Sequence, residues 1–152
     1  MPGKIPEEEK KSIESYAMRR ESQYKAAEDR YKAAERDLRI AEAEIKEADS
    51  LLKASQEKQK EMQDGQTVAS RQFREGQIDR NQYERAMHDY NEKEGRYMED
   101  ERSIKSNRSS LEYKRDSAQR ERDAAKRELD GMERDKALEQ AQGKNQEKER
   151  SV

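Results

Sequence analysis

Histidine, cysteine and clustered acidic side chains are the groups through which this chain could bind a metal ion or catalyse a reaction. His88 is the only histidine, and the sequence contains no cysteine. A protein zinc site needs about four converging ligands, and no second imidazole or thiolate can join His88. We therefore interpret His88 as a surface residue of a helix, and we expect neither a metal site nor a cofactor.

Acidic residues gather in one segment, which contains Glu42, Glu44, Glu47 and Asp49. Catalytic carboxylates need a cleft that excludes water and holds a substrate. A helix with a repeating apolar stripe leaves no room for such a cleft. We therefore predict a solvated acidic face, with a weak cation site or a basic partner as the alternative. The expected protein has no catalytic residues, no small-molecule substrate and no enzyme activity.

A basic stretch runs from Arg102 to Arg115 and contains one acidic residue, Glu112. Arg102, Lys105 and Arg108 recur every three residues, so a helix would place them on one face. Such a face could contact phosphate groups in a salt-sensitive manner, but no recognised nucleic-acid-binding motif accompanies it. Protein docking is a further alternative. The interpretation that we favour is ion pairing across a helical hairpin with the acidic residues Glu28, Asp29, Glu35 and Asp37.

The composition limits which elements can carry these groups. Charged residues make up 46% of the 152 residues and hydrophobic residues 29%, with no tryptophan and one phenylalanine. So little apolar surface cannot fill a compact core, which leaves a disordered chain or long helices that bury one stripe. Only two prolines interrupt a sequence rich in good helix formers. The composition and periodicity together predict an all-α protein.

Two apolar stripes repeat every seven residues. The first is a full heptad seam: Tyr24, Ala27, Tyr31, Ala34, Leu38, Ala41, Ile45, Ala48 and Leu52. The second has one apolar position per heptad and includes Tyr83, Tyr90, Tyr97, Ile104 and Leu111. Apolar residues spaced on average 3.5 apart predict a left-handed coiled coil. Arginine stems on the second helix, such as Arg108, could cover the alanines; alternatively, Ala27, Ala34, Ala41 and Ala48 receive a further helix.

Turn and cap signals predict the boundaries of one helical domain, residues 1–142. The first helix is expected at about 6–62, because Asp64-Gly65 resembles a helix stop. A connector over 63–78 would hold a short helix capped by Thr67. Asp79 and Gln82 have the spacing of a capping box, so the second helix is expected at about 79–142. The remaining residues, 143–152, are predicted to form a disordered tail.

Folding the chain at residue 71 brings the two stripes opposite each other. Leu52 then faces Tyr90, Ile45 faces Tyr97, Leu38 faces Ile104, and Tyr31 faces Leu111. The predicted fold is therefore a long antiparallel two-helix coiled-coil hairpin, although closure between two chains stays open. A hairpin with so little buried surface is marginal alone. We therefore expect a homodimer that forms a four-helix bundle, or a complex with a helical protein.

Apolar residues of the connector and two tyrosines outside the seams are the candidate partner contacts. Val68, Phe73 and Ile78 either pack on one another, Met62 and Tyr83, or form a docking surface at the hairpin tip. The basic residues Arg102, Lys105 and Arg108 are the other partner-binding candidates. Tyr16 and Tyr113 also lie off the seams, where their rings could contact a partner.

These features predict a non-enzymatic protein–protein interaction module that acts as a scaffold, spacer or docking rod. In length, charge and two-helix layout the chain resembles the small coiled-coil stalk proteins of bacterial type III and flagellar export. That resemblance implies an alternative role, binding to an ATPase or to a helical client. A third alternative is a weak nucleic-acid or membrane-surface binder that uses the basic stretch. The net charge of −2 disfavours it.

The expected location is the cytoplasm. The N-terminal residues MPGKIPEEEKK lack the hydrophobic stretch of a signal peptide. No apolar run approaches the roughly 20 residues that span a bilayer. Export by a route without a signal peptide stays open.

Overall fold

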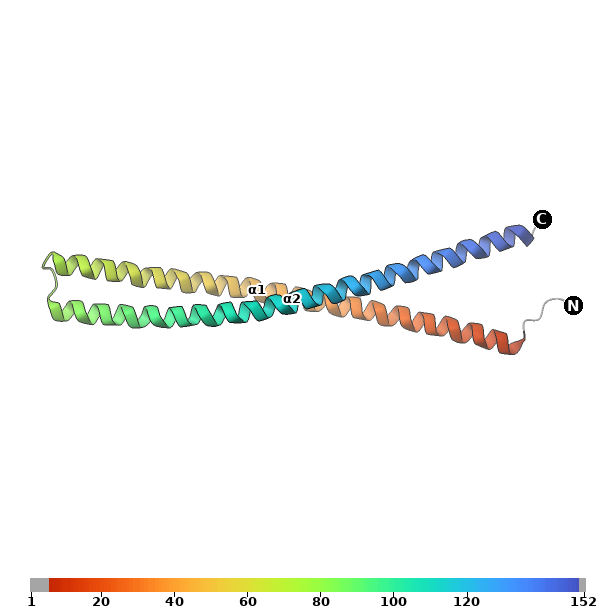
Figure 1. The fold of residues 1–152 in the computed structure, drawn as a ribbon, viewed down its shortest axis with the longest axis horizontal. Coiled ribbons are helices and arrows are strands. Elements are labelled where there is room, and N and C mark those ends of the chain that lie inside the picture. Colours follow the sequence, from red (N-terminus) through yellow and green to blue (C-terminus); the bar gives the residue numbers. More distant parts are fainter. Residues whose placement is uncertain (1–5, 151–152) are drawn as a thin grey trace. The chain divides into compact units, whose positions relative to one another are not determined.

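Two long helices make up the part of the chain that the structure describes, and no strand accompanies them there. The structure is a computed structural model that describes the backbone of residues 6–150 and the side chains of residues 6–143. Helix α1 runs over Glu7–Arg74 and helix α2 over Arg80–Arg150 (Figure 1). The predicted all-α class is therefore confirmed. The chain divides into unit 1, which holds α1 up to Leu38 and α2 from Asp116, and unit 2, Arg39–Arg115.

Unit 2 is an antiparallel helical hairpin, as the two apolar stripes predicted. Its segments of α1 and α2 lie side by side and are joined by a short turn (Figure 1). Ile45 and Ala48 of α1 pack with Leu111 of α2, and Ile104 packs against this cluster. The apolar core of unit 2 is therefore one narrow stripe between the helices.

Unit 1 pairs the first part of α1 with the last part of α2. Ala27, Ala34 and Leu38 of α1 are buried, as are Ala118 and Ala125 of α2. Among the described residues, seven of the ten buried apolar side chains of both units are alanines. Alanine lets two helix backbones approach closely but contributes little apolar area. The buried stripe therefore positions the helices while stabilising them only modestly.

The prediction that the first helix ends near residue 62 is wrong, because α1 continues through Gly65 to Arg74. Gly65 lies against the ring of Tyr90, and a Cβ atom added to it would stand 2.5 Å from the tyrosine Cε1. Gly65 thus permits close packing inside a helix and does not stop it. Thr67 caps no short helix; its hydroxyl donates a hydrogen bond to the Gln63 carbonyl oxygen of the same helix (3.0 Å).

The actual end of α1 lies at Gly76, which has a φ of +72°. The Gln77 amide donates to the Gln72 carbonyl oxygen (2.9 Å), and the Gly76 amide donates to the Phe73 carbonyl oxygen (3.2 Å). These two bonds form a Schellman motif, in which glycine readily adopts the left-handed conformation. The connector is therefore confined to residues 75–79, whereas the sequence predicted 63–78.

The predicted start of the second helix is confirmed. The Gln82 amide donates to Asp79 Oδ1 (2.8 Å), and the Asp79 amide donates to Gln82 Oε1 (3.0 Å). This reciprocal pair is the expected capping box, and α2 begins one residue after Asp79, at Arg80.

The predicted pairing register is wrong by two heptads. Leu111 packs with Ile45, where the sequence predicted Tyr31. Likewise, Tyr90 packs on Gly65, whereas the prediction placed it opposite Leu52. A repeat of seven aligns equally well after a shift of seven or fourteen residues. Because the first helix was predicted to end too early, the fold point was placed at residue 71. The two apolar stripes still matched each other at that fold point.

The predicted disordered tail also needs correction, because α2 extends to Arg150. Gly143 lies within this helix and does not end it. The following residues include Gln, Glu, Lys and Arg, which are good helix formers and need no apolar anchor to be helical. Residues 151 and 152 lie outside the described residues.

Candidate interaction surfaces

The predicted seam residues lie between the helices, with burial that depends on side-chain size. Six residues of α1 and one of α2 are buried: Ala27, Ala34, Leu38, Ala41, Ile45, Ala48 and Leu111. Most of the larger seam residues are half-buried: Tyr31, Leu52, Tyr83, Tyr90, Tyr97 and Ile104. Tyr24 is exposed and donates a hydrogen bond from its hydroxyl to Glu133 (3.3 Å). Because α2 covers the alanines within each unit, they do not form a free face for a further helix.

Between Ser55 and the turn, polar residues alternate with apolar ones such as the buried Ala69 in the seam of unit 2. Ser55 is buried, and its hydroxyl donates to the Tyr97 carbonyl oxygen (2.8 Å). The Gln59 amide nitrogen donates to Glu101 Oε2 (2.6 Å), and the Gln56 amide nitrogen donates to Glu101 Oε1 (3.3 Å). Hydrogen bonds from Gln59, Lys105 and Gln56 lower the pKa of Glu101 from 4.5 to about 2. The Glu101 carboxylate is therefore the centre of a cross-helix polar cluster.

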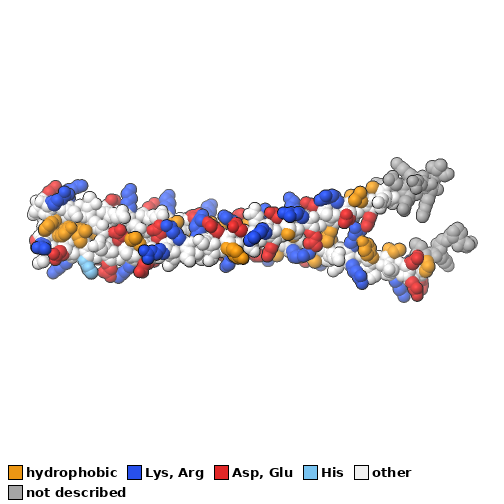
Figure 2. Space-filling view, in the orientation of Figure 1, with side chains coloured by type: hydrophobic (Ala, Val, Ile, Leu, Met, Phe, Trp, Pro, Cys, Tyr) orange, Lys and Arg blue, Asp and Glu red, His pale blue; other side chains and the backbone are white. Residues whose placement is uncertain are grey.

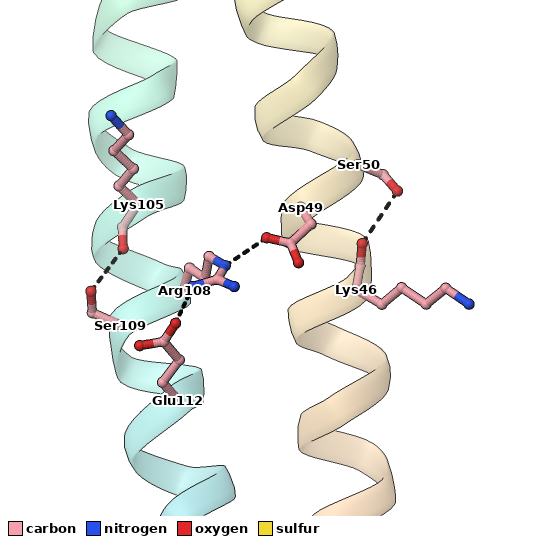
Figure 3. Close-up of polar contacts among 7 residues, drawn as sticks. All are labelled: Lys46, Asp49, Ser50, Lys105, Arg108, Ser109 and Glu112. Carbon is pink, nitrogen blue, oxygen red and sulfur yellow. Dashed lines mark hydrogen bonds and ion pairs between the residues drawn. The ribbon is translucent and has the colours of Figure 1, made fainter.

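The basic stretch supplies contacts within unit 2. Arg108 donates to Asp49 on α1 (2.6 Å) and also pairs with Glu112 on its own helix (Figure 3). Lys105 pairs with Glu101 at 3.0 Å. The predicted pairing of Lys105 and Arg108 with acidic residues 28–37 is therefore wrong, because it depended on the shifted register. Arg102 is exposed.

Serine hydroxyls in this stretch bond to their own helix. Ser109 donates to the Lys105 carbonyl oxygen (3.1 Å; Figure 3), and Ser110 donates to the Ser106 carbonyl oxygen (3.4 Å). With Lys105 and Arg108 in ion pairs, the stretch offers fewer groups to phosphate than its sequence suggested.

The histidine and the acidic segment lie on the helix surface. Glu42, Glu44 and Glu47 are exposed, and Asp49 pairs with Arg108. His88 Nε2 lies 3.9 Å from Glu92 Oε2, one helical turn away. Among the described residues, no three His, Cys, Asp or Glu side chains are grouped so that they could hold a metal ion. No described helix has an apolar stretch that could cross a membrane.

The three predicted tip residues of unit 2 differ in how far they are buried at the turn. The Phe73 ring stacks on Tyr83, with centroids 4.7 Å apart and planes inclined by 19°. Ile78 is half-buried, whereas Val68 is 48% exposed on α1. Much of the apolar surface at the tip therefore packs within the turn, in agreement with the packing alternative. Val68 and the uncovered part of Phe73 remain accessible to a partner.

A groove between the helices of unit 1 forms the larger candidate surface, with a volume of about 890 Å³. Ile13, Tyr16 and Met18 line it from α1 and are 59%, 61% and 71% exposed. Met132 and Lys136 line it from α2. Figure 2 shows hydrophobic side chains on both helices at the end of unit 1 that is farthest from the turn. Tyr16 was predicted from the sequence as a candidate partner contact, whereas the groove was not predicted.

A detectable signal did exist for the groove of unit 1. Counting the heptad backwards from Tyr24 places Ile13 and Ala17 at seam positions, yet both are exposed. Arg20 occupies the seam position between Ala17 and Tyr24. Its guanidinium pairs with Glu139 of α2 and lies 5.7 Å from the centre of the Tyr16 ring. The seam is thus present in the sequence here but is not closed by α2.

A second groove, of about 410 Å³, lies along one edge of unit 2. Four residues of α1 and four of α2 line it: Leu51, Ala54, Ser55, Lys58, Tyr97, Asp100, Ser103 and Ile104. Leu51 is 53% exposed. This groove was not predicted from the sequence because Leu51 lies outside the predicted seam.

Comparison with protein-family models, with curated proteins and with solved structures found no match for this chain. Its function therefore has to be inferred from the surfaces that the two units present.

Proposed function

We propose that the chain is a non-enzymatic coiled-coil module that binds a helical protein partner and acts as a scaffold or spacer. The observation that carries this proposal is the groove of unit 1, where seam residues of α1 lie uncovered. Ile13 and Ala17 continue the heptad phase, but solvent, not α2, covers most of Ile13. An apolar stripe in heptad phase is suited to packing against another helix.

The chemistry of the groove of unit 1 favours a protein ligand. Tyr16 and Met18 present large, adaptable apolar surfaces, which are enriched at protein interfaces. Glu21, Glu133 and Lys136 surround them with charges of both signs. A mixed-charge border of this kind matches the polar rim of a protein interface. It offers no uniformly basic surface for nucleic acid.

Photo-crosslinking from the groove tests this proposal. A photoreactive phenylalanine in place of Tyr16 should capture one protein species in cells, and mass spectrometry should locate the adduct in a helical segment of that protein. The captured partner, once purified, should bind the unmodified chain directly. The double variant Ile13→Ser, Tyr16→Ser should weaken this binding by at least roughly tenfold, since two apolar contacts are lost.

Tyr113 provides the matched control, because it is 70% exposed and lies in unit 2, outside both grooves. The same photoreactive residue at 113 should not capture that partner, and Tyr113→Ser should leave the affinity unchanged. Equal capture from both positions, or no direct binding by the purified partner, would contradict the proposal.

The phosphate-binding alternative receives less support from the structure than from the sequence. Lys105 and Arg108, two of its three candidate residues, are engaged in ion pairs within unit 2. A ligand phosphate would have to compete with these carboxylates. The resemblance to export-apparatus stalk proteins stays an alternative at the level of general layout.

A further inference from the structure

The two edges of the hairpin in unit 2 differ in chemistry. Along one edge, polar side chains bridge the helices: Arg108 contacts Asp49, and Gln56 contacts Glu101 (Figure 3 shows the first pair). Along the other edge lies the groove of about 410 Å³, with Leu51 on its α1 side. One edge is thus closed by polar contacts, whereas the other leaves an apolar depression open.

Leu51 breaks the pattern of its own heptad position. The residues one heptad away on either side of it, Glu44 and Lys58, are charged. A charged residue suits this exposed position beside a coiled-coil seam, yet here a leucine is 53% exposed. Ala54 lies one helical turn away and lines the same groove, with Tyr97 and Ile104 on the facing helix. Together these residues form a short second apolar seam, in which Leu51 and Ala54 lie three residues apart on α1.

We propose that this second seam is a self-association surface, on which two copies of the chain pair through antiparallel α1 helices. Leu51 of each copy would pack beside the partner's Ala54, in the partner's groove. The pairing is isologous, so the same two residues are used twice around a two-fold axis, the commonest symmetry of soluble oligomers. This inference names one partner of the proposed interaction module, at a surface separate from the groove of unit 1.

The charges on α1 favour a second copy in this antiparallel arrangement. The segment 42–50 contains four acidic residues and Lys46, whereas the segment 52–60 contains three lysines and Glu57, so the first is net negative and the second net positive. When Leu51 faces the partner's Ala54, Glu47 comes opposite the partner's Lys58, and this ion pair occurs twice. A parallel arrangement would instead set the acidic segments against each other.

One contact opposes the pairing and limits its strength. The same alignment places Glu44 opposite the partner's Glu61, although Lys58 already neutralises Glu61 within its own chain (3.6 Å). Two small apolar layers and two exposed ion pairs support a weak, salt-sensitive dimer, not an obligate one. Self-association should therefore depend on concentration within the range that light scattering can follow.

The test is the oligomeric mass of the full chain, measured by size-exclusion chromatography with light scattering over a wide concentration range. The unaltered chain should move from one-chain to two-chain mass as its concentration rises. Leu51→Glu should raise the dissociation constant by at least roughly tenfold, because it buries a carboxylate against apolar side chains. Leu138→Glu is the matched control, since Leu138 is 61% exposed in unit 1, and it should leave the dimer intact.

Charge reversal tests the alignment itself. Glu47→Lys and Lys58→Glu should each weaken the dimer, and the chain that carries both should recover it, because the ion pair is restored with its signs exchanged. Circular dichroism of every variant verifies that the helices persist. A chain that stays a single copy at all concentrations overturns the proposal, as does a dimer that Leu51→Glu leaves unchanged or that the double reversal does not recover.

Failure here can be distinguished from failure of the proposed function. If the chain is monomeric but the groove of unit 1 still captures its protein partner, self-association alone is rejected. If the chain dimerises through Leu51 but Tyr16 captures no protein, the groove of unit 1 is rejected and the self-association surface stands.

Discussion

The seam of unit 1 and the part of the unit 2 seam nearest the turn use different chemistry for the same task of pairing two helices. In unit 1 the buried residues are Ala27, Ala34, Leu38, Ala118 and Ala125. Near the turn of unit 2, Ser55, Gln59 and Gln66 occupy the equivalent α1 positions. They donate hydrogen bonds to backbone or carboxylate oxygens of α2. The buried residues of the first region are all apolar, whereas the second region combines buried Ala69 with individually matched polar contacts.

This difference indicates that the apolar residues stabilise helix pairing, whereas the contacts near the turn determine its register. Alanines repeated every seven residues pack about equally well after a shift of one or two heptads, so they stabilise helix pairing without selecting one alignment. The contacts near the turn cannot shift in this way. Gly65 fits the Tyr90 ring, and Gln66 donates to both Asn91 (2.8 Å) and Glu94 (2.7 Å). We infer that these contacts select the register in which the apolar residues pair.

The largest expected effect concerns the apolar core of unit 2. Leu111→Ala should lower the free energy of unfolding by about 2–4 kcal/mol, because it removes a buried side chain from the Ile45 cluster. Leu138→Ala, on the same helix but 61% exposed, should cost less than about 0.5 kcal/mol. Urea unfolding followed by circular dichroism measures both. Equal losses would contradict the assignment of Leu111 to the core.

Substitutions at two glycines of unit 2 test the close packing near the turn. Both Gly65→Ala and Gly95→Ala should gain up to about 1 kcal/mol from helix propensity. A Cβ at 95 has no neighbour within 4 Å, whereas one at 65 would meet the Tyr90 ring. Overpacking should therefore leave Gly65→Ala about 1–3 kcal/mol less stable than Gly95→Ala. Thermal unfolding checks the order, and equal stabilisation would show that Gly65 is not packed on Tyr90.

The polar cluster should make stability depend on acid pH. Since folding lowers the pKa of Glu101 to about 2, its ionised form stabilises the folded state above about pH 4.5. This contribution is lost progressively as the pH falls from about 4.5 towards 2. The unfolding temperature of the unaltered chain should therefore exceed that of Glu101→Gln at neutral pH, and the difference should shrink over this window.

Glu99→Gln serves as the control for Glu101, because Glu99 is an exposed carboxylate two residues away on the same helix. At neutral pH this substitution should lower the unfolding temperature less than Glu101→Gln does. If the two substitutions lower it equally, the Glu101 carboxylate does not hold the cluster together.

The smallest expected effect concerns the ion pair at the helix surface. Asp49→Asn removes one of two carboxylate partners of Arg108 and should cost about 0.5 kcal/mol or less, because both side chains are partly exposed. High salt should abolish the difference. Asp64→Asn, at an exposed position of the same helix, is the control that measures by urea unfolding how much the loss of an unrelated carboxylate changes stability. If Asp49→Asn instead caused a larger loss of stability that salt did not change, the Asp49–Arg108 ion pair would also help to select the register.

The sequence predicted the features that depend on local or periodic signals. The capping box of Asp79 and Gln82 was correct because both partners lie within one helical turn. The repeat of seven located the residues that the structure buries, such as Ala34 and Ile45. Such signals are read from neighbouring residues or from their spacing, so they require no knowledge of the partner segment.

The features that escaped prediction depend on contacts distant in sequence. Gly65 has the local signature of a helix stop, and only its contact with Tyr90 explains its place within α1. The heptad continues past Leu52 through Ser55 and Gln59, but the predicted seam ended at Leu52 because these two residues are polar and their acceptors on α2 were unknown. For the same reason, Leu51 and Ile13 stood outside the predicted sites, since exposure of an apolar residue depends on what the second helix covers.

Short-range chemical crosslinking within unit 2 tests whether the contacts near the turn set the register of the two helices. The chain has no cysteine, so the pairs Gln66→Cys with Asn91→Cys and Leu52→Cys with Asn91→Cys can be introduced separately. Each is treated with a short bismaleimide at low protein concentration, and mass spectrometry identifies the intrachain product. If the contacts near the turn set the register, residues 66 and 91 should be bridged rapidly, and residues 52 and 91 should not be bridged. Preferential bridging of 52 and 91 would show that the hairpin closes two heptads away and would contradict this prediction.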